Sequence, residues 1–152
     1  MAPIGSKVLA REDGNALIEM AFVLPLLLFV VAGIIDFGFM FQRYEVVTNA
    51  AREGARLAVL PNYTDTDVKA RVVTYLQAGG LTATPTTNDV QYVTIQLDDA
   101  GEKTMSGVTV TVGYPHTFTI LGPLAQLFDA SFGTIGLTAT STMRAEVAAA
   151  EE

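Results

Sequence analysis

A single carboxylate, Glu19, lies at the start of a long apolar run, where a charged side chain is costly in free energy. Residues 20–35 contain no charged or hydrogen-bonding side chain. A carboxylate within a membrane helix costs about 2.5–3.5 kcal/mol at the bilayer centre and less toward the interface, so it normally needs a partner. If the chain were cut after Gly14, the new α-amino group of Asn15 would lie one helical turn from Glu19. That amino group could pair with Glu19 of a neighbouring subunit. Alternatively, Glu19 extends to the membrane surface.

The element that would position this carboxylate is a helix long enough to cross a membrane. At 1.5 Å per residue, Ala16–Phe41 would span about 39 Å, against a hydrocarbon core of about 30 Å. We therefore predict a transmembrane helix over residues 15–41. Pro25 removes one hydrogen bond inside it and would bend it, which neighbouring helices can accommodate. Asp36 lies about 26 Å beyond Glu19, near the outer interface, as a hydrated carboxylate or a second assembly contact.

The residues before the apolar run resemble a short polar leader. A secretory signal peptide has its apolar region before the cleavage site, whereas here a short leader that carries Lys7, Arg11, Glu12 and Asp13 comes first and the apolar run follows. Lys7 and Arg11 precede the run, which favours a cytoplasmic N-terminus and an extracytoplasmic remainder. A plain uncleaved anchor is the alternative.

Composition and motifs give little support for catalysis. The 152 residues carry a formal charge of −7, which disfavours a nucleic-acid partner, and the absence of cysteine excludes disulfides and thiolate chemistry. His116, the only histidine, has no acidic neighbour in sequence, so we interpret it as structural or surface-exposed. Asp65 and Asp67 fit helix caps better than calcium ligands. We therefore expect no enzyme activity, no metal and no cofactor.

A helical stalk over residues 42–60 should follow the anchor, because no helix breaker occurs before Pro61. A stripe along it consists of Met40, Tyr44, Val47, Ala51, Gly54 and Ala58. The small residues Ala50, Ala51, Gly54 and Ala58 would let another backbone approach closely. That backbone belongs either to the chain's own sheet or to another subunit.

Residues 61–152 are predicted to form a small α+β domain. A helix is expected over residues 67–78, stopped by Gly79-Gly80, with Val68, Val72 and Leu76 inward. After a loop over residues 81–88, alternating patterns predict three strands, at residues 93–97, 108–114 and 135–146, with a turn at 98–102 and a short segment at 122–128. Three strands with one apolar face need a helix as cover, which predicts a small antiparallel sheet packed on the long helix.

Several of these motifs together resemble a known family. They are Gly14-x-Ala16-x-x-Glu19-x-Ala21, Pro25, Gly33-x-x-Asp36-x-Gly38 and Ala50-Ala51-Arg52-Glu53-Gly54-Ala55-Arg56. The first resembles the prepilin cleavage site of type IV pilin-like proteins, with a Gly before the cut and a Glu fifth after it. The whole set resembles the TadE-like minor pilins, or pseudopilins, of the tight-adherence (Tad/Flp) pilus system. Met20 replaces the Tyr that follows the Glu in major Flp pilins, which argues against the main fibre subunit.

The resemblance implies a structural, non-enzymatic function in an adhesive pilus used for surface attachment and biofilm formation. A prepilin peptidase would cut between Gly14 and Asn15, and Glu19, Pro25 and Asp36 would serve assembly. The implied partners are that peptidase, other pilins or pseudopilins, the assembly platform of the bacterial inner membrane and the lipid bilayer. The alternative function is an uncleaved, membrane-tethered extracytoplasmic binding module.

Overall fold

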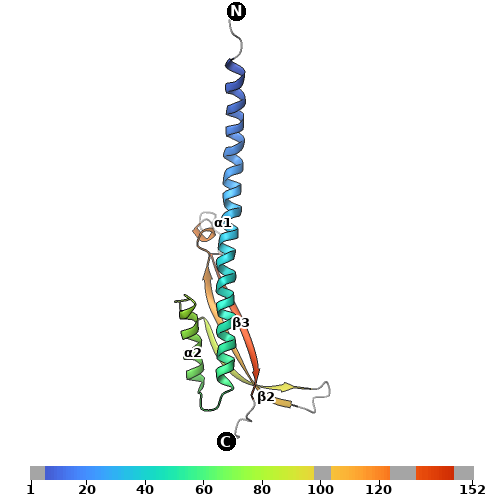
Figure 1. Cartoon of the computed structure of the whole chain (residues 1–152), viewed down its shortest axis with the longest axis vertical. Helices are drawn as coiled ribbons and strands as arrows, with labels where there is room; N and C mark the ends of the chain where they lie inside the picture. The colour runs from blue at the N-terminus through green and yellow to red at the C-terminus, as the bar shows by residue number, and fades with distance from the viewer. Residues whose placement is uncertain (1–5, 98–103, 124–132, 146–152) are drawn as a thin grey trace, which may run out of the picture.

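The computed structural model describes residues 6–97, 104–123 and 133–145, and these form a long helix with a small α+β domain on its second half. Figure 1 shows α1 as a rod that extends far beyond the domain toward the N-terminus, with α2 and the sheet beside its lower half. The predicted α+β class, with a long apolar helix, a short second helix and a three-stranded antiparallel sheet, is confirmed.

The long helix, α1, runs without interruption over Ser6–Ala58. We expected it to begin near Ala16, but it starts well before Gly14. A glycine inside a helix costs only about 1 kcal/mol relative to alanine, so Gly14 alone does not end the helix. At the other end α1 stops at Ala58, just before the expected Leu60, whose amide donates to the Leu57 carbonyl at 3.1 Å in a final turn.

The second helix, α2, covers Asp65–Ala78, starting two residues before the predicted boundary because Thr64 is the N-cap. The Thr64 hydroxyl accepts a hydrogen bond from the Asp67 amide, and the Asp67 carboxylate accepts one from the Thr64 amide, which makes a capping box. At the C-terminus Gly80 adopts a φ of +80°, and the Leu81 amide donates to Leu76 O at 2.9 Å. This Schellman motif explains why the Gly-Gly pair stops the helix.

The sheet is an antiparallel meander in the order β1-β2-β3. Its strands are β1 (Thr87–Gln96), β2 (Thr104–Thr117) and β3 (Thr134–Arg144). The boundaries correct the sequence prediction: β1 begins inside the expected loop, and β2 continues through Pro115. Residues two apart in a strand direct their backbone groups to the same side. The Gly113 carbonyl points toward β1, so the backbone of Pro115 faces that side too, at a level that β1 does not reach. The missing N–H of Pro115 therefore leaves no gap in the ladder. The predicted turn at 98–102 lies outside the described residues, as does most of the segment at 122–128.

One face of the sheet packs on both helices: α1 lies against β2 and β3, and α2 against β1 (Figure 1). The opposite face is rich in threonine, with hydroxyl pairs such as Thr109–Thr142 at 2.8 Å across β2 and β3. The buried residues of the core come mainly from α1, α2 and the sheet. They are Val47, Ala50, Ala51, Ala55, Val68, Val72, Leu76, Leu81, Val108, Val110, Val112, Tyr114 and Ala139. The second half of α1 is therefore the centre of the domain's core.

Gly54 marks the closest approach between α1 and the rest of the core. A Cβ atom added to it would lie 2.7 Å from Val72 Cγ2 and 3.1 Å from Val110 Cγ1. Both distances are shorter than ordinary van der Waals contact, so only glycine lets α2 and β2 meet α1 at this level.

Candidate functional site

The expected processing sequence lies on the exposed surface of α1. Asn15 and Glu19 are exposed, and Asn15 Nδ2 donates to Glu19 Oε1 at 3.4 Å, one helical turn apart. A Cβ added to Gly14 would meet nothing within 4 Å. The carboxylate and the backbone before it are therefore open to a partner, although the peptide bond at Gly14 lies within a helix.

Beyond Glu19 the surface of α1 is apolar. It is a helix long and apolar enough to cross a membrane, with a mean hydropathy of 2.6 over its most apolar window, and none of that window is buried within the protein. Large side chains such as Phe22, Leu26 and Ile34 are more than 60% exposed. Such a continuous apolar surface is stable only when lipid or other helices cover it.

Pro25 lies within this apolar segment, and α1 continues through it as one helix. Pro25 still lacks an amide, so the carbonyl one turn earlier has no intrahelical partner. Pro25 therefore weakens the hydrogen bonding of α1 locally without ending the helix.

Asp36 connects the anchor to the domain. Only 1% of its surface is exposed, which corrects our expectation of a hydrated carboxylate. Its Oδ1 accepts hydrogen bonds from the amides of Thr119 (3.1 Å) and Ile120 (3.2 Å), and its Oδ2 from Ile120 (2.9 Å) and Leu121 (2.7 Å). These amides open a helical turn after β2, so the carboxylate acts as a cap supplied by a distant part of the chain.

His116 and Arg43 form a second polar contact, further along α1 toward its C-terminus. Arg43 Nη1 donates to His116 Nδ1 at 3.1 Å, because a guanidinium group has no acceptor. The imidazole proton therefore lies on Nε2, which is buried and has no partner among the described residues. Burial lowers the pKa of His116, the Arg43 charge lowers it further, and the Asp36 carboxylate acts in the opposite direction. His116 is thus a neutral, structural histidine.

An aromatic cluster fills the space between these two contacts. Phe118 is buried and meets the His116 ring edge-on, with ring centroids 4.9 Å apart. It also meets Phe37 of α1, with centroids 5.8 Å apart. Asp36, Phe37 and Arg43 on α1 therefore hold one continuous stretch of the domain, residues 116–121. The sequence did not predict these contacts, because the partners are more than seventy residues apart and no local pattern connects them.

The small residues of the stalk lie under the chain's own domain. Ala50 and Ala51 are fully buried in the core, Gly54 contacts α2 and β2, and Ala58 is half-buried. Tyr44 departs from the expected stripe, since 44% of its surface is exposed. Of the two occupants that the sequence allowed, the domain itself covers the small-residue face.

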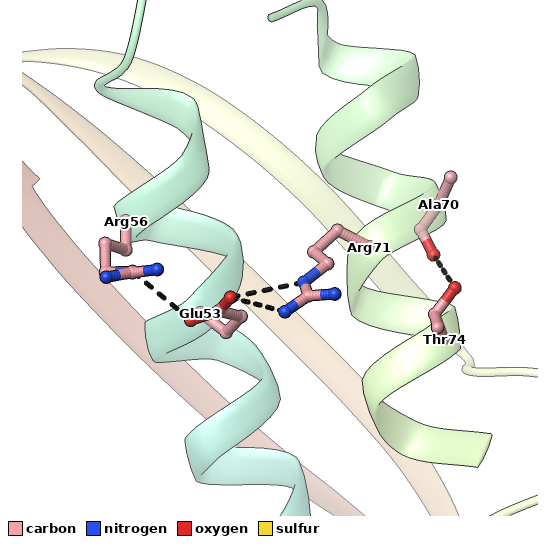
Figure 2. Close-up of polar contacts among 5 residues, drawn as sticks. All are labelled: Glu53, Arg56, Ala70, Arg71 and Thr74. Carbon is pink, nitrogen blue, oxygen red and sulfur yellow. Dashed lines mark hydrogen bonds and ion pairs between the residues drawn. The ribbon is translucent and has the colours of Figure 1, made fainter. Parts of the chain in front are cut away.

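An ion-pair cluster joins the two helices near the same level, as Figure 2 shows. Arg71 of α2 donates from Nε (3.2 Å) and Nη2 (2.8 Å) to one oxygen of Glu53, while Arg56 Nε lies 3.4 Å from the other. All three side chains are partly or largely exposed, so the cluster orients the helices more than it stabilises them.

The described residues contain no group of three or more His, Asp or Glu side chains that could hold a metal ion. Near the far end of the sheet, a groove is lined by Tyr63, Tyr92 and Val108 among others, and Tyr92 donates to Asp65 Oδ1 at 3.0 Å. This hydrogen bond to a carboxylate raises the pKa of Tyr92, which makes the phenol harder to ionise.

Together these features define a class: an α+β domain built around the second half of an apolar anchor helix. The family model described as TadE-like protein matches residues 14–56, from the glycine of the expected processing site to the end of the stalk. Residues 14–56 are therefore similar to TadE-like proteins, a family associated with the Tad pilus and structural rather than catalytic, and over these residues the resemblance drawn from the sequence is confirmed. No curated protein and no solved structure matches the chain.

Proposed function

We propose that this protein is a minor pilin or pseudopilin, cut between Gly14 and Asn15 by a prepilin peptidase and then used in assembly of a Tad-type adhesive pilus. The observation that carries the proposal is the family match, which begins at Gly14 and includes Glu19. In this proposal the apolar segment within residues 15–41 spans the bacterial inner membrane and the domain lies outside the cytoplasm.

The exposed position of Glu19 supports its proposed function. Among the described residues the carboxylate accepts a long hydrogen bond of 3.4 Å from the side-chain amide of Asn15. After cleavage, the Asn15 α-amino group would offer a full positive charge within one helical turn. Pairing of this amino group with Glu19 of a neighbouring subunit would remove both charges from the apolar surroundings.

The helix around Gly14 gives the peptidase reaction a structural requirement. A protease acts on an extended backbone, so the first turns of α1 must open before the cut. Gly14 lowers the cost of opening by about 1 kcal/mol relative to alanine. Among the described residues, the hydrogen bonds between α1 and the domain begin at Asp36 and the buried core begins at Val47, so this opening would leave the core unchanged.

Mass spectrometry of the purified full-length chain tests the proposal. In cells that contain the prepilin peptidase we expect a mature protein that begins at Asn15, and in cells without it an intact protein. An intact Met1 in the presence of active peptidase would contradict the proposal and favour the uncleaved, membrane-tethered binding module.

A further inference from the structure

The contact between Asp36 and the turn after β2 has a consequence for the membrane. Residues 16–35 are apolar apart from Glu19, and at 1.5 Å per residue they cover about 30 Å, the thickness of the hydrocarbon core. Asp36 thus lies where the hydrocarbon ends. Because Thr119, Ile120 and Leu121 donate to its carboxylate, these three residues lie at the same depth.

We infer that the turn formed by residues 119–121 is a membrane-contact surface, which rests on the outer interface of the bilayer and sets the depth of the anchor. The occupant of this surface is lipid, at the boundary between the headgroups and the acyl chains. The inference requires that α1 crosses a bilayer, and it does not depend on cleavage or pilus assembly.

The side chains around the contact suit this position. Ile120 is 42% exposed although its amide is bound, and Phe37 and Phe39 of α1 are each 47% exposed at the same level. Their apolar surface continues that of the membrane-spanning segment. Asp36 itself presents no charge to the lipid, since its two oxygens accept four hydrogen bonds from backbone amides and are almost fully covered.

The next charged residue marks the aqueous side. Arg43 follows Asp36 by seven residues, about 10 Å along the helix, which exceeds the 5–7 Å thickness of one headgroup layer. Its guanidinium group binds His116 rather than an acidic residue. Along α1 the apolar segment is therefore followed by the capped carboxylate of Asp36, then by aromatic side chains and then by the Arg43 cation. This order is expected for a helix that leaves a bilayer at Asp36 and not at Phe41.

The absence of tryptophan from the chain makes the depth measurable by a single fluorescent residue. The full-length protein would be reconstituted into vesicles of equal parts phosphatidylcholine and phosphatidylglycerol, with bromine near the headgroup end or the methyl end of the acyl chains. Ile120→Trp is the test variant. Phe22→Trp, on the exposed apolar surface, reports insertion of the anchor, and Leu60→Trp, at the far end of the domain, is the matched aqueous control.

We expect the Ile120→Trp variant to have blue-shifted emission that is quenched most by bromine near the headgroup end. Phe22→Trp should be quenched most by bromine near the methyl end, and Leu60→Trp by neither lipid. A Thr119→Cys variant carrying an environment-sensitive dye gives a second reading at an exposed site.

Two results would overturn the inference while Phe22→Trp still reports an inserted anchor. In the first, iodide in the buffer quenches Ile120→Trp as strongly as Leu60→Trp, which would place the turn in water. In the second, neither iodide nor brominated lipid quenches it, which would mean that another protein chain covers the turn.

Discussion

The Ile120 amide donates to both carboxylate oxygens of Asp36, at 3.2 and 2.9 Å, across 84 residues of sequence. The neighbouring amides of Thr119 and Leu121 complete the cap. This arrangement fixes the turn after β2 to α1 and couples the apolar segment of that helix to the domain.

Replacement of Asp36 by alanine should release this turn. The variant leaves three amides without their charged acceptor, so we expect the domain to lose about 2–4 kcal/mol of stability. Asp36→Asn keeps one carbonyl acceptor and should lose less. Amide hydrogen exchange of the full chain in detergent measures the effect directly. Unchanged exchange at Thr119, Ile120 and Leu121 in the alanine variant would contradict the cap.

A second prediction concerns the close approach at Gly54. In Gly54→Ala the new methyl group meets Val72 and Val110, whose branched side chains are stiff at χ1, so overpacking should cost about 1–3 kcal/mol despite the better helix propensity of alanine. Gly38→Ala is the matched control on the same helix, because its Cβ would meet nothing within 4 Å. We expect it to be neutral or slightly stabilising. Thermal unfolding followed by circular dichroism compares the two, and equal behaviour would exclude a packing requirement at Gly54.

The elements that the sequence predicts well are those with a local physical signal. The Gly79-Gly80 stop and the inward Val68, Val72 and Leu76 all follow from spacing within one helix. The apolar run gives the anchor and its exposed surface in the same way. The prediction of the processing residues Gly14 and Asn15 rests on a motif that lies within the segment matched by the family model.

The remaining features depend on partners that are distant in sequence. Thr87 and Asn88 resemble loop residues, yet they start β1 because Gly113 and Val112 of β2 face them in register, and Asn88 Nδ2 also donates to Lys69 O of α2. The burial of Asp36 and His116 requires knowledge of how the turn after β2 meets α1. No periodicity within one element contains that information.

The pKa of His116 predicts a pH dependence of stability. Because burial and Arg43 hold it below its ordinary value of about 6.5, the unfolded chain binds a proton more readily than the folded one. Stability is therefore complete above about pH 6.5 and falls as the pH drops toward the folded pKa, by at most about 1.4 kcal/mol per pH unit. Denaturant titrations at several pH values measure this slope. His116→Gln retains a hydrogen-bond acceptor for Arg43 and should flatten the slope over this range; an equal slope would assign it to other groups.

The Glu53 cluster should contribute little in spite of its short distances. Arg71 is about half exposed and Glu53 about one fifth, so solvent screens the pair, and we expect a coupling free energy below about 1 kcal/mol. A double-mutant cycle with Glu53→Gln and Arg71→Gln measures this coupling, and added salt should reduce it. The cycle with Arg56→Gln, whose side chain is 71% exposed, should give a smaller value. A coupling of several kcal/mol between Glu53 and Arg71 would mean that the pair is desolvated in the assembled protein.

The last prediction separates the two proposed properties of the anchor's N-terminal end. In Glu19→Ala the backbone at Gly14 is unchanged, so we expect cleavage to continue, with a mature protein that begins at Asn15. Assembly should fail, because the new amino group has no carboxylate to pair with in the apolar surroundings. Glu19→Gln is the matched control: it retains the size and hydrogen bonding of the side chain but lacks the charge, and should also fail. Mass spectrometry reports the first step, and the amount of pilus sheared from cells reports the second. Normal piliation by both variants would remove Glu19 from the assembly contact, whereas loss of cleavage in either one would mean that the peptidase itself recognises the carboxylate.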